Sequence, residues 1–487
     1  MNKDIAISIL DAKNIPEFLK NISDVNIEVT KLNEEVYKKN NTFLNNKIHF
    51  DVMDGKFVPC EGIKLEYIKD AKKLGFYVDT HLMVEEPILD KYIENAIMYG
   101  TDNITIHYEI DNFEEVLNHL NDIKKQLFES NEKRILDIGI AIKPSTSIEG
   151  LEKYKDKFSK ILFMSVEPGY GGQKYIFQVN EKIKDAKKIF TSKIFQVDGG
   201  VNFTTISDPY RLGIDSFVIG SYFSKTNSFE GLLEKVMKIN LLSQIENLPK
   251  DANIEFDSKL LQIVKEGYGQ DDKLIGITNP NIRKLVSKVY KEIKLEYLDE
   301  FFCSKYHEYR QFCLFVLSSK VKIIMLDTKL TLNKKMKNIK LIINFMNKNI
   351  KHINNWDLTD EAGINILGAY LINLNEKNME ETLNKYLSSN NIWTKRLGIV
   401  SLLTLVKNYY IKLPLKICKN NMYHENHLIQ KACGWVLRQI YVKDNEQVKS
   451  LLKISNEENK IPSIVMSYAS EKMSKNEKEY IRGIKNE

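Results

Sequence analysis

The chain has 487 residues, a formal net charge of +6, 43% hydrophobic residues and 28% charged residues. This composition is typical of a globular protein, and the length predicts two domains of roughly 200–250 residues each. The apolar runs are shorter than the ~18 residues of a membrane span, and the first residues lack the long apolar region of a signal peptide, so we expect no membrane association. Five cysteines without a Cys-x-x-Cys spacing predict reduced thiols and a cytoplasmic protein.

Charge is distributed unevenly along the chain. Residues 251–487 carry 38 basic and 27 acidic side chains, a net charge of +11, whereas residues 1–250 carry 33 basic and 38 acidic side chains, a net charge of −5. The two halves are therefore expected to meet different kinds of partner, and the basic half is the candidate for binding a polyanion.

The first 225 residues alternate between apolar, β-branched runs and charged stretches with helical periodicity. The predicted strands are 5–10, 47–52, 76–83, 103–107, 136–142, 161–166, 194–198 and 215–220. Predicted helices between them include 62–74, 87–99, 111–129 and 178–190. Strands that are apolar along their whole length are typical of a parallel sheet with both faces covered, and eight of them predict an α/β fold, a (β/α)8 TIM barrel.

The pattern changes after Lys225. A helix over 229–242 is expected to close a first domain of residues 1–242, and residues 243–255 read as a polar linker. Residues 256–487 show no convincing strand and are predicted to form an all-α domain, because amphipathic helices follow one another with short polar loops. Its predicted helices are 257–267, 280–293, 307–320, 360–371, 394–408 and 425–440.

Four polar residues lie at the ends of predicted barrel strands: His49, Asp51, His81 and Asp198. His49 and Asp51 are two residues apart, so their side chains point to the same face of a strand. A lone histidine or aspartate at a strand end is usually a hydrogen-bonded structural group, but four at matching ends favour a divalent-metal site. Such ligands suit Zn²⁺, Fe²⁺, Mn²⁺ or Co²⁺ better than Mg²⁺. The carboxylates could also move protons beside a carbonyl group.

Glycines follow each of the last three predicted strands, in the segments Gly169-Tyr-Gly-Gly172, Gly199-Gly200 and Gly220-Ser221. Glycine lets backbone N–H groups approach an anion, and the late strands are the usual phosphate position in TIM barrels. One such loop would more often be a simple turn, whereas three on adjacent strands predict a phosphorylated substrate.

With these motifs, residues 4–240 resemble ribulose-phosphate 3-epimerase. The shared sequences are Ser8-Ile-Leu, His49-x-Asp51-Val-Met-Asp-Gly, Asp79-x-His81-Leu-Met, Pro168-Gly-Tyr-Gly-Gly-Gln-Lys and Val197-Asp-Gly-Gly. The resemblance implies one divalent metal ion, Zn²⁺ or Fe²⁺ in the first place and Mn²⁺ or Co²⁺ as alternatives, held by His49, Asp51, His81 and Asp198. Asp51 and Asp198 would then act as acid and base at C3, interconverting D-ribulose 5-phosphate and D-xylulose 5-phosphate through an enediolate.

The resemblance also implies the substrate contacts and a homo-oligomer formed through the barrel. Ser8 would touch the substrate, three methionines would cap the enediolate, and the glycine loops with Ser221 would hold the phosphate. These residues are Ser8, Met53, Met83, Met164, Gly171, Gly172, Gly199, Gly200, Gly220 and Ser221.

Three features depart from the family pattern. Ile7 replaces a proline, Lys143 replaces an asparagine, and residues 24–46 form an insertion that could change the first loop, an oligomer interface or the choice of substrate. Relatives of this family act on allulose or allose 6-phosphate with the same site, so a different ketose phosphate is the alternative substrate.

All three tryptophans of the chain lie in the helical half. A tryptophan on a helix is usually packed in a core, with a nearby aspartate as a cap. Residues 250–480 nevertheless resemble the HEAT-repeat-like alkylpurine DNA glycosylases of the DNA alkylation repair family, which implies a HEAT-like solenoid. The shared pieces are Gly276-Ile-x-x-Pro280-x-x-Arg283, His307-Glu-Tyr-Arg310, Asn355-Trp356-Asp-x-x-Asp360, Trp393-x-x-Arg396 and Lys431-Ala-x-Gly-Trp435-x-Leu-Arg438.

This second resemblance implies a site made of Trp356, Asp360, Arg396 and Trp435, with double-stranded DNA as the partner. Asp360 would stabilise the positive sugar as an alkylated purine leaves, Arg396 would hold a phosphate, and the two indole rings would pack against the sugar. Two other readings stay open: the helical half could bind DNA or act as a scaffold without chemistry, or the barrel could be weakened by its insertion, leaving only glycosylase activity.

Overall fold

The computed structural model describes residues 3–36, 46–130, 134–226 and 228–482. The chain forms two compact units, Met1–Asn247 and Leu248–Glu487. The helix that was expected to end the first domain at 242 continues to Glu246, and the first helix of the second unit begins at Ile254. No helix in the described part of the chain is both long and apolar enough to cross a membrane.

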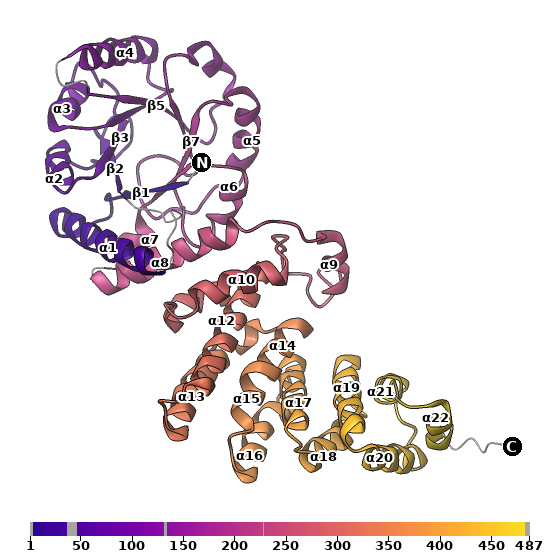
Figure 1. Cartoon of the computed structure of the whole chain (residues 1–487). Coiled ribbons are helices and arrows are strands. Elements are labelled where there is room, and N and C mark those ends of the chain that lie inside the picture. The colour runs from indigo at the N-terminus through magenta and orange to yellow at the C-terminus, as the bar shows by residue number, and fades with distance from the viewer. Residues whose placement is uncertain (1–2, 37–45, 131–133, 227, 483–487) are drawn as a thin grey trace. The chain divides into compact units, whose positions relative to one another are not determined.

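The first unit is a closed barrel of eight parallel strands, in which each strand pairs with the next and β8 pairs with β1 (Figure 1). Its strands are β1 Asp4–Ser8, β2 Lys47–Met53, β3 Tyr77–Met83, β4 Asn103–His107, β5 Asp137–Ile142, β6 Lys160–Met164, β7 Ile194–Asp198 and β8 Ser216–Ile219. The predicted (β/α)8 barrel is confirmed. Almost every strand residue is buried, because helices cover the outside while side chains fill the inside.

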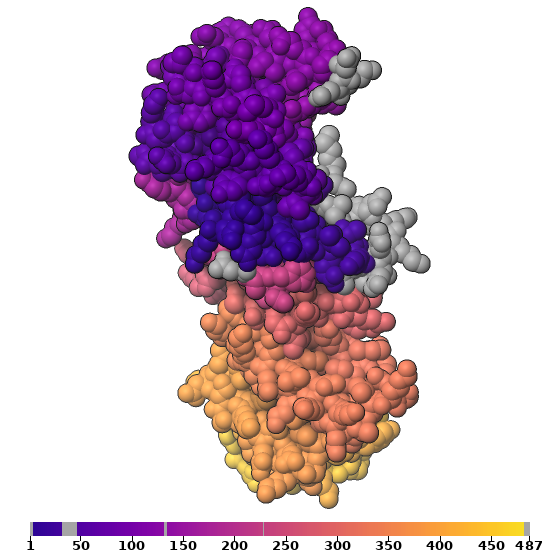
Figure 2. All heavy atoms as spheres, turned by 90° about the vertical axis from the view of Figure 1, so that its left-hand side faces the viewer, coloured from indigo at the N-terminus to yellow at the C-terminus, as the bar shows by residue number. Residues whose placement is uncertain are grey.

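Helices surround the barrel strands (Figure 1). They are α1 Ile15–Val36, α2 Ile68–Lys73, α3 Tyr92–Tyr99, α4 Phe113–Glu129, α5 Val179–Ile189, α6 Ser207–Arg211, α7 Ser221–Ser224 and α8 Phe229–Glu246. The first part of the predicted insertion 24–46 belongs to α1, which lies on the surface of the barrel unit (Figure 2). Residues 37–45 of that insertion lie outside the described residues.

Every regular element in the described part of the second unit is a helix, apart from an isolated bridge. One series of helices packs each against the next: α10 Asn279–Val289, α12 His307–Leu326, α14 Trp356–Ala362 with its continuation to Leu371, α17 Ile392–Lys407, α19 His427–Lys443 and α21 Ser463–Ala469. A second series packs against the first: α13 Leu332–Lys348, α16 Glu376–Leu387, α18 Lys412–Asn421 and α20 Asn445–Glu458. The predicted all-α solenoid is confirmed (Figure 1).

The predicted helix 257–267 is wrong in its bounds, since α9 spans Ile254–Leu260. Gln262 and Glu266 have positive φ angles of 55° and 66°. Such left-handed residues cannot continue an α-helix, so the chain turns here instead. The apolar residues that suggested the longer helix, such as Val264, remain partly exposed on this turn.

Candidate functional site

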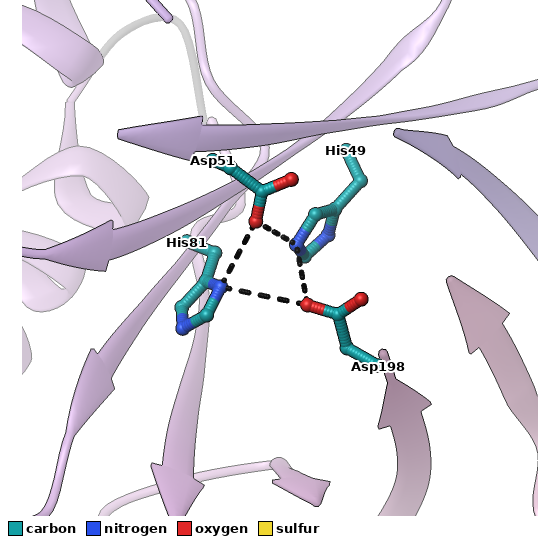
Figure 3. Close-up of side chains that lie close together, drawn as sticks. All are labelled: His49, Asp51, His81 and Asp198. Carbon is teal, nitrogen blue, oxygen red and sulfur yellow. Dashed lines mark hydrogen bonds and ion pairs between the residues drawn. The ribbon is translucent and has the colours of Figure 1, made fainter. Parts of the chain in front are cut away.

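The four predicted ligand residues point toward one centre inside the barrel (Figure 3). His49 and Asp51 lie on β2, His81 lies on the neighbouring β3, and Asp198 is the last residue of β7. One possible ligand atom from each residue lies within 4.8 Å of the other three. His49 and Asp51 sit within β2 rather than at its end, because this strand continues to Met53.

The spacing of these atoms suits a shared metal ion. Asp51 Oδ1 lies 3.3 Å from both His49 Nε2 and His81 Nδ1, and Asp198 Oδ2 lies 3.8 and 3.9 Å from the same two nitrogens. Two ligands about 2.1 Å from a tetrahedral ion are separated by about 3.4 Å. His49 Nε2 is buried and makes no hydrogen bond within the described structure. The residues present therefore fit a divalent ion.

A buried carboxylate fixes the tautomer of His49. Asp79 Oδ2 lies 3.1 Å from His49 Nδ1, so Nδ1 carries a proton. Burial would lower the pKa of His49, but Asp51 and Asp79 outweigh it and raise that pKa to about 10, so a metal ion would displace the second proton from Nε2. Asp79 also accepts hydrogen bonds from Lys160 Nζ at 2.6 Å and from Gln196 Nε2 at 2.8 Å. The sequence placed Asp79 in a family motif without assigning it this role.

A second chain of hydrogen bonds reaches His81. Its Nε2 lies 2.9 Å from His107 Nε2, and His107 Nδ1 lies 2.9 Å from Glu109 Oε2. With the proton of His107 on Nδ1, facing the carboxylate, His107 Nε2 accepts from His81 Nε2–H and leaves the His81 Nδ1 lone pair free for a metal. Sequence reasoning missed this relay, although His107 ends β4 on the same barrel face as the ligands.

The surroundings shift the pKa values of Asp51 and Asp198 in opposite directions. Burial would raise the pKa of Asp51, but His49 and His81 outweigh it and hold that pKa well below its usual range. Burial and the Asp51 carboxylate raise the pKa of Asp198 to about 7. A pair of carboxyl groups whose environments separate their pKa values is the usual arrangement for an acid and a base.

A cavity opens beside the cluster. It has a volume of about 60 Å³, which leaves room for only a few water molecules. All ten residues predicted to touch the substrate line it: Ser8, Met53, Met83, Met164, Gly171, Gly172, Gly199, Gly200, Gly220 and Ser221. Asp11, which the sequence did not suggest, lines it as well.

Close backbone approach explains the glycines at this cavity. Gly200 has a φ angle of +64°, and a Cβ atom there would lie 2.5 Å from the backbone nitrogen of Tyr175. A Cβ atom on Gly171 would lie 2.4 Å from Asp11 Oδ1. A larger residue at position 200 would push against the backbone of the loop at Tyr175, whereas one at position 171 would displace the Asp11 side chain.

In the helical unit, the structure brings Asp360 and Arg396 together. Arg396 Nη2 lies 2.8 and 3.2 Å from the two carboxylate oxygens of Asp360, and Arg396 Nη1 donates to the carbonyl of Leu428 at 2.8 Å. Arg396 is thus a buried partner of Asp360, which differs from the phosphate contact that the resemblance implied. Burial raises the pKa of Asp360 to about 6, although Arg396 opposes the shift.

The tryptophans of the helical unit have different surroundings. Trp356 begins α14, where the Asn355 side chain accepts from its backbone N–H at 2.8 Å, and is partly exposed. Trp435 is partly exposed on α19. Because α14 packs on α17 and α17 packs on α19, Trp356, Asp360, Arg396 and Trp435 lie on adjacent helices. Trp393 is buried against Tyr268 and serves the core.

Two of the motifs shared with the repair family brace one loop. Glu308 Oε1 accepts from the backbone N–H groups of Ile275 and Gly276, both at 2.8 Å. His307 lies between Asp272, 3.2 Å from its Nδ1, and Asp357, 2.8 Å from its Nε2. These residues therefore tie α12 to the preceding loop and to the start of α14, beside Trp356.

The fold and the cluster define the first unit as a TIM-barrel protein with a candidate metal site inside the barrel. Residues 22–224 match the ribulose-phosphate 3 epimerase family, and residues 246–473 match the family described as DNA alkylation repair enzyme. The chain belongs to the ribulose-phosphate 3-epimerase family, and both resemblances seen in the sequence are confirmed.

Two ribulose-phosphate 3-epimerases agree with the assignment of the barrel unit. The ribulose-phosphate 3-epimerase of Aquifex aeolicus is 31% identical over 199 residues, covering 40% of this chain and 84% of that protein. The enzyme of the same name from Bacillus subtilis is 35% identical over 182 residues, covering 36% and 77%. A solved structure of a predicted DNA alkylation repair enzyme from Enterococcus faecalis is 17% identical and covers 47% of this chain and all of that one, with a TM-score of 0.34.

Glu109→Gln tests the relay to His81. Glu109 Oε1 accepts from the Lys143 backbone N–H at 2.7 Å, so a glutamine must keep its oxygen there and turn its amide N–H₂ group toward His107. His107 and then His81 would exchange tautomers, which places a proton on His81 Nδ1. We expect the affinity for Zn²⁺ to fall about 10- to 100-fold, measured by titration calorimetry of the full chain.

The control is Glu94→Gln. Glu94 Oε1 lies 3.0 Å from His119 Nε2 on the outside of the barrel, so the same substitution changes a histidine contact that has no link to the cluster. Its Zn²⁺ affinity should stay unchanged. An unchanged affinity in Glu109→Gln would contradict the relay.

Proposed function

We propose that the barrel unit interconverts D-ribulose 5-phosphate and D-xylulose 5-phosphate by moving the proton at C3 between Asp51 and Asp198. The observation that carries the proposal is the cluster of two histidines and two aspartates beside a cavity lined by three methionines and the glycine loops. Membership of the ribulose-phosphate 3-epimerase family supports it. A divalent ion held by His49, Asp51, His81 and Asp198 would polarise the substrate oxygens and stabilise the charge of the enediolate.

The two aspartates suit an inversion, because one group must remove the proton and another must return it from the opposite side. They come from β2 and β7 and reach the centre from different strands (Figure 3). Ser8 Oγ donates to Asp51 Oδ2 at 2.7 Å while Asp51 Oδ1 faces the histidines. This hydrogen bond fixes the Asp51 carboxylate against rotation and leaves it at the edge of the cavity.

The methionines would keep water away from the reacting carbon. Met53 and Met83 pack with Val58 in one apolar cluster, and Met164 packs in another with Val166. An enediolate exposed to water would take protons from solvent without stereochemical control, so an apolar cap favours return of the proton by the aspartates.

The phosphate would lie at the opposite end of the cavity, beside the glycine loops. Gly220 precedes the short helix α7, which starts at Ser221 after the last strand. Loops after the late strands and the start of a short extra helix form the usual phosphate site of TIM barrels. Gly171 and Gly172, from the loop after β6, line the same cavity.

The direct test is epimerisation of D-ribulose 5-phosphate by the full chain, with and without a chelator. Asp198→Asn should lower kcat about 10²- to 10⁴-fold, the usual contribution of a positioned acid or base, and chelation should abolish turnover until metal is restored. Asp90→Asn is the control, because Asp90 pairs with Lys56 at the surface. If the protein acts only on allulose 6-phosphate, the proposed substrate is wrong but the proposed mechanism stands. Full activity in Asp198→Asn would contradict the mechanism.

We further propose that the helical unit binds double-stranded DNA and releases alkylated purines, with Asp360 stabilising the positive sugar. The match to the DNA alkylation repair family supports this, as do the net charge of +11 in residues 251–487 and the partly exposed Trp356 and Trp435 on helices adjacent to Arg396. Arg396 would keep Asp360 ionised and correctly oriented. The five free cysteines fit a reducing compartment such as the cytoplasm, and assembly through the barrel remains a prediction.

The pH dependence of base release tests this second activity. Asp360 acts as a carboxylate and its pKa is raised to about 6, so protonation below that pH removes the active form. Release of 7-methylguanine from duplex DNA should therefore rise with pH through about 6 and then level off. Asp360→Asn should abolish release at every pH, whereas Asp198→Asn in the barrel should leave it unchanged. Release that does not depend on Asp360 would contradict the proposal.

A further inference from the structure

The helical unit contains a cavity of about 550 Å³, and neither Asp360 nor Arg396 lines it. Four successive elements of the inner helix series contribute to it: α10, α12, α14 with its continuation, and α17. Its polar lining residues include Arg283, Ser318, Lys322, Glu361, Asn365 and Lys407. The volume lies within the range of about 300–1,000 Å³ that is typical of small-molecule sites.

Two polar atoms in the lining are buried without a partner. Glu361 Oε2 accepts from Arg283 Nη2 at 2.7 Å, but Glu361 Oε1 makes no hydrogen bond within the described structure, and the side chain is only 8% exposed. Ser318 Oγ is likewise buried and unpartnered there. Buried polar groups nearly always have a partner, so an unpartnered carboxylate oxygen in the lining favours a ligand that carries a hydrogen-bond donor.

The helix that carries Glu361 is irregular at the cavity. Residues Gly363–Leu367 form a π-helix, and Ile364 and Asn365 within it line the cavity. The Ile364 carbonyl accepts from Thr404 Oγ1 at 2.7 Å, so α17 compensates for the altered hydrogen-bonding pattern. Single turns of π-helix are rare and occur frequently at functional sites.

The charged residues and the apolar walls of the cavity indicate which other groups the ligand carries. Arg283, Lys322 and Lys407 are exposed cations around one buried carboxylate, Glu361, which favours an anionic group on the ligand. Val321, Met325 and Ile372 supply apolar wall. The cavity thus combines an acceptor for N–H groups, apolar surface for a ring and cations for a phosphate.

We propose that this cavity binds a guanine nucleotide, with the base on Glu361 and the phosphate near Lys322 and Lys407. Guanine carries two adjacent donors, N1–H and N2–H, that match the two oxygens of a carboxylate. Adenine and cytosine place an acceptor nitrogen beside their single amino group, and thymine and uracil flank their N–H with two carbonyl oxygens. A carboxylate repels each of those acceptors. This site goes beyond the two proposed activities and does not depend on them.

Titration calorimetry of the full chain with GMP and with AMP tests the proposal. We expect one GMP site per chain, with AMP bound at least ten-fold more weakly. Glu361→Gln should weaken GMP at least ten-fold, because the glutamine amide turns a donor toward the donors of guanine. Lys407→Ala should weaken GMP but not guanosine, which has no phosphate. The epimerisation rate should be the same in all of these proteins.

A matched control is Glu380→Gln, because Glu380 pairs with Lys416 at 2.7 Å on other helices and should bind GMP normally. Ser318→Ala removes only one hydroxyl group and should also weaken GMP, which keeps the test valid if Glu361→Gln does not fold. Equal binding of AMP and GMP, or normal GMP binding in both Glu361→Gln and Ser318→Ala, would overturn the proposal.

A guanine nucleotide could be free or part of a nucleic-acid strand. A single-stranded oligothymidylate with one central guanine, compared with oligothymidylate alone, separates the two sources. Binding of GMP assigns the cavity to a free nucleotide, whereas binding only of the guanine-containing strand assigns it to DNA. Failure of both probes would overturn the proposal without affecting the base-release assay.

Discussion

The burial of two carboxylates and two imidazoles at one end of the barrel is the constraint on which the first unit depends. Asp51, His49 and His81 are almost completely buried, and charges removed from water must be balanced by partners close by. The strands bring the carboxylate oxygens to 3.3–3.9 Å from the imidazole nitrogens, and a divalent cation would balance the two carboxylate charges. The same proximity lowers the pKa of Asp51 and raises that of Asp198. The arrangement that balances the buried charges therefore also suits the proposed proton transfer.

Two buried chains of hydrogen bonds orient the two histidines of this cluster. Asp79, itself neutralised by Lys160, sets the proton of His49, and Glu109 sets the proton of His81 through His107. Both chains run inside or along the rim of the barrel, where burial limits competition from water. The candidate ligand atoms are therefore already positioned, which would reduce the reorganisation that binding an ion requires.

In the helical unit, an arginine rather than a cluster of histidines partners the buried carboxylate. Arg396 neutralises Asp360 directly, and burial leaves the pKa of that aspartate raised. Glu361, the next residue on α14, faces another cavity and pairs with Arg283. Successive residues of a helix point in different directions. Glu361 therefore lines this cavity, whereas Asp360 does not. The two proposed sites can be tested independently for that reason.

The sequence alone predicts the eight strands, the four clustered polar residues and the glycine loops of the barrel, because buried parallel strands are apolar along their length and polar residues within them are conspicuous. It also determined most of the inner helix series of the second unit. It missed the outer series, including α13 and α16, whose lysine- and asparagine-rich faces obscure a narrow apolar stripe. Three facts could be read only from the folded chain: His107 and Glu109 connect in series to His81, Arg396 pairs with Asp360, and one carboxylate oxygen of Glu361 has no partner among the described residues. Those facts depend on distances between residues far apart in the chain, on which local periodicity carries no information.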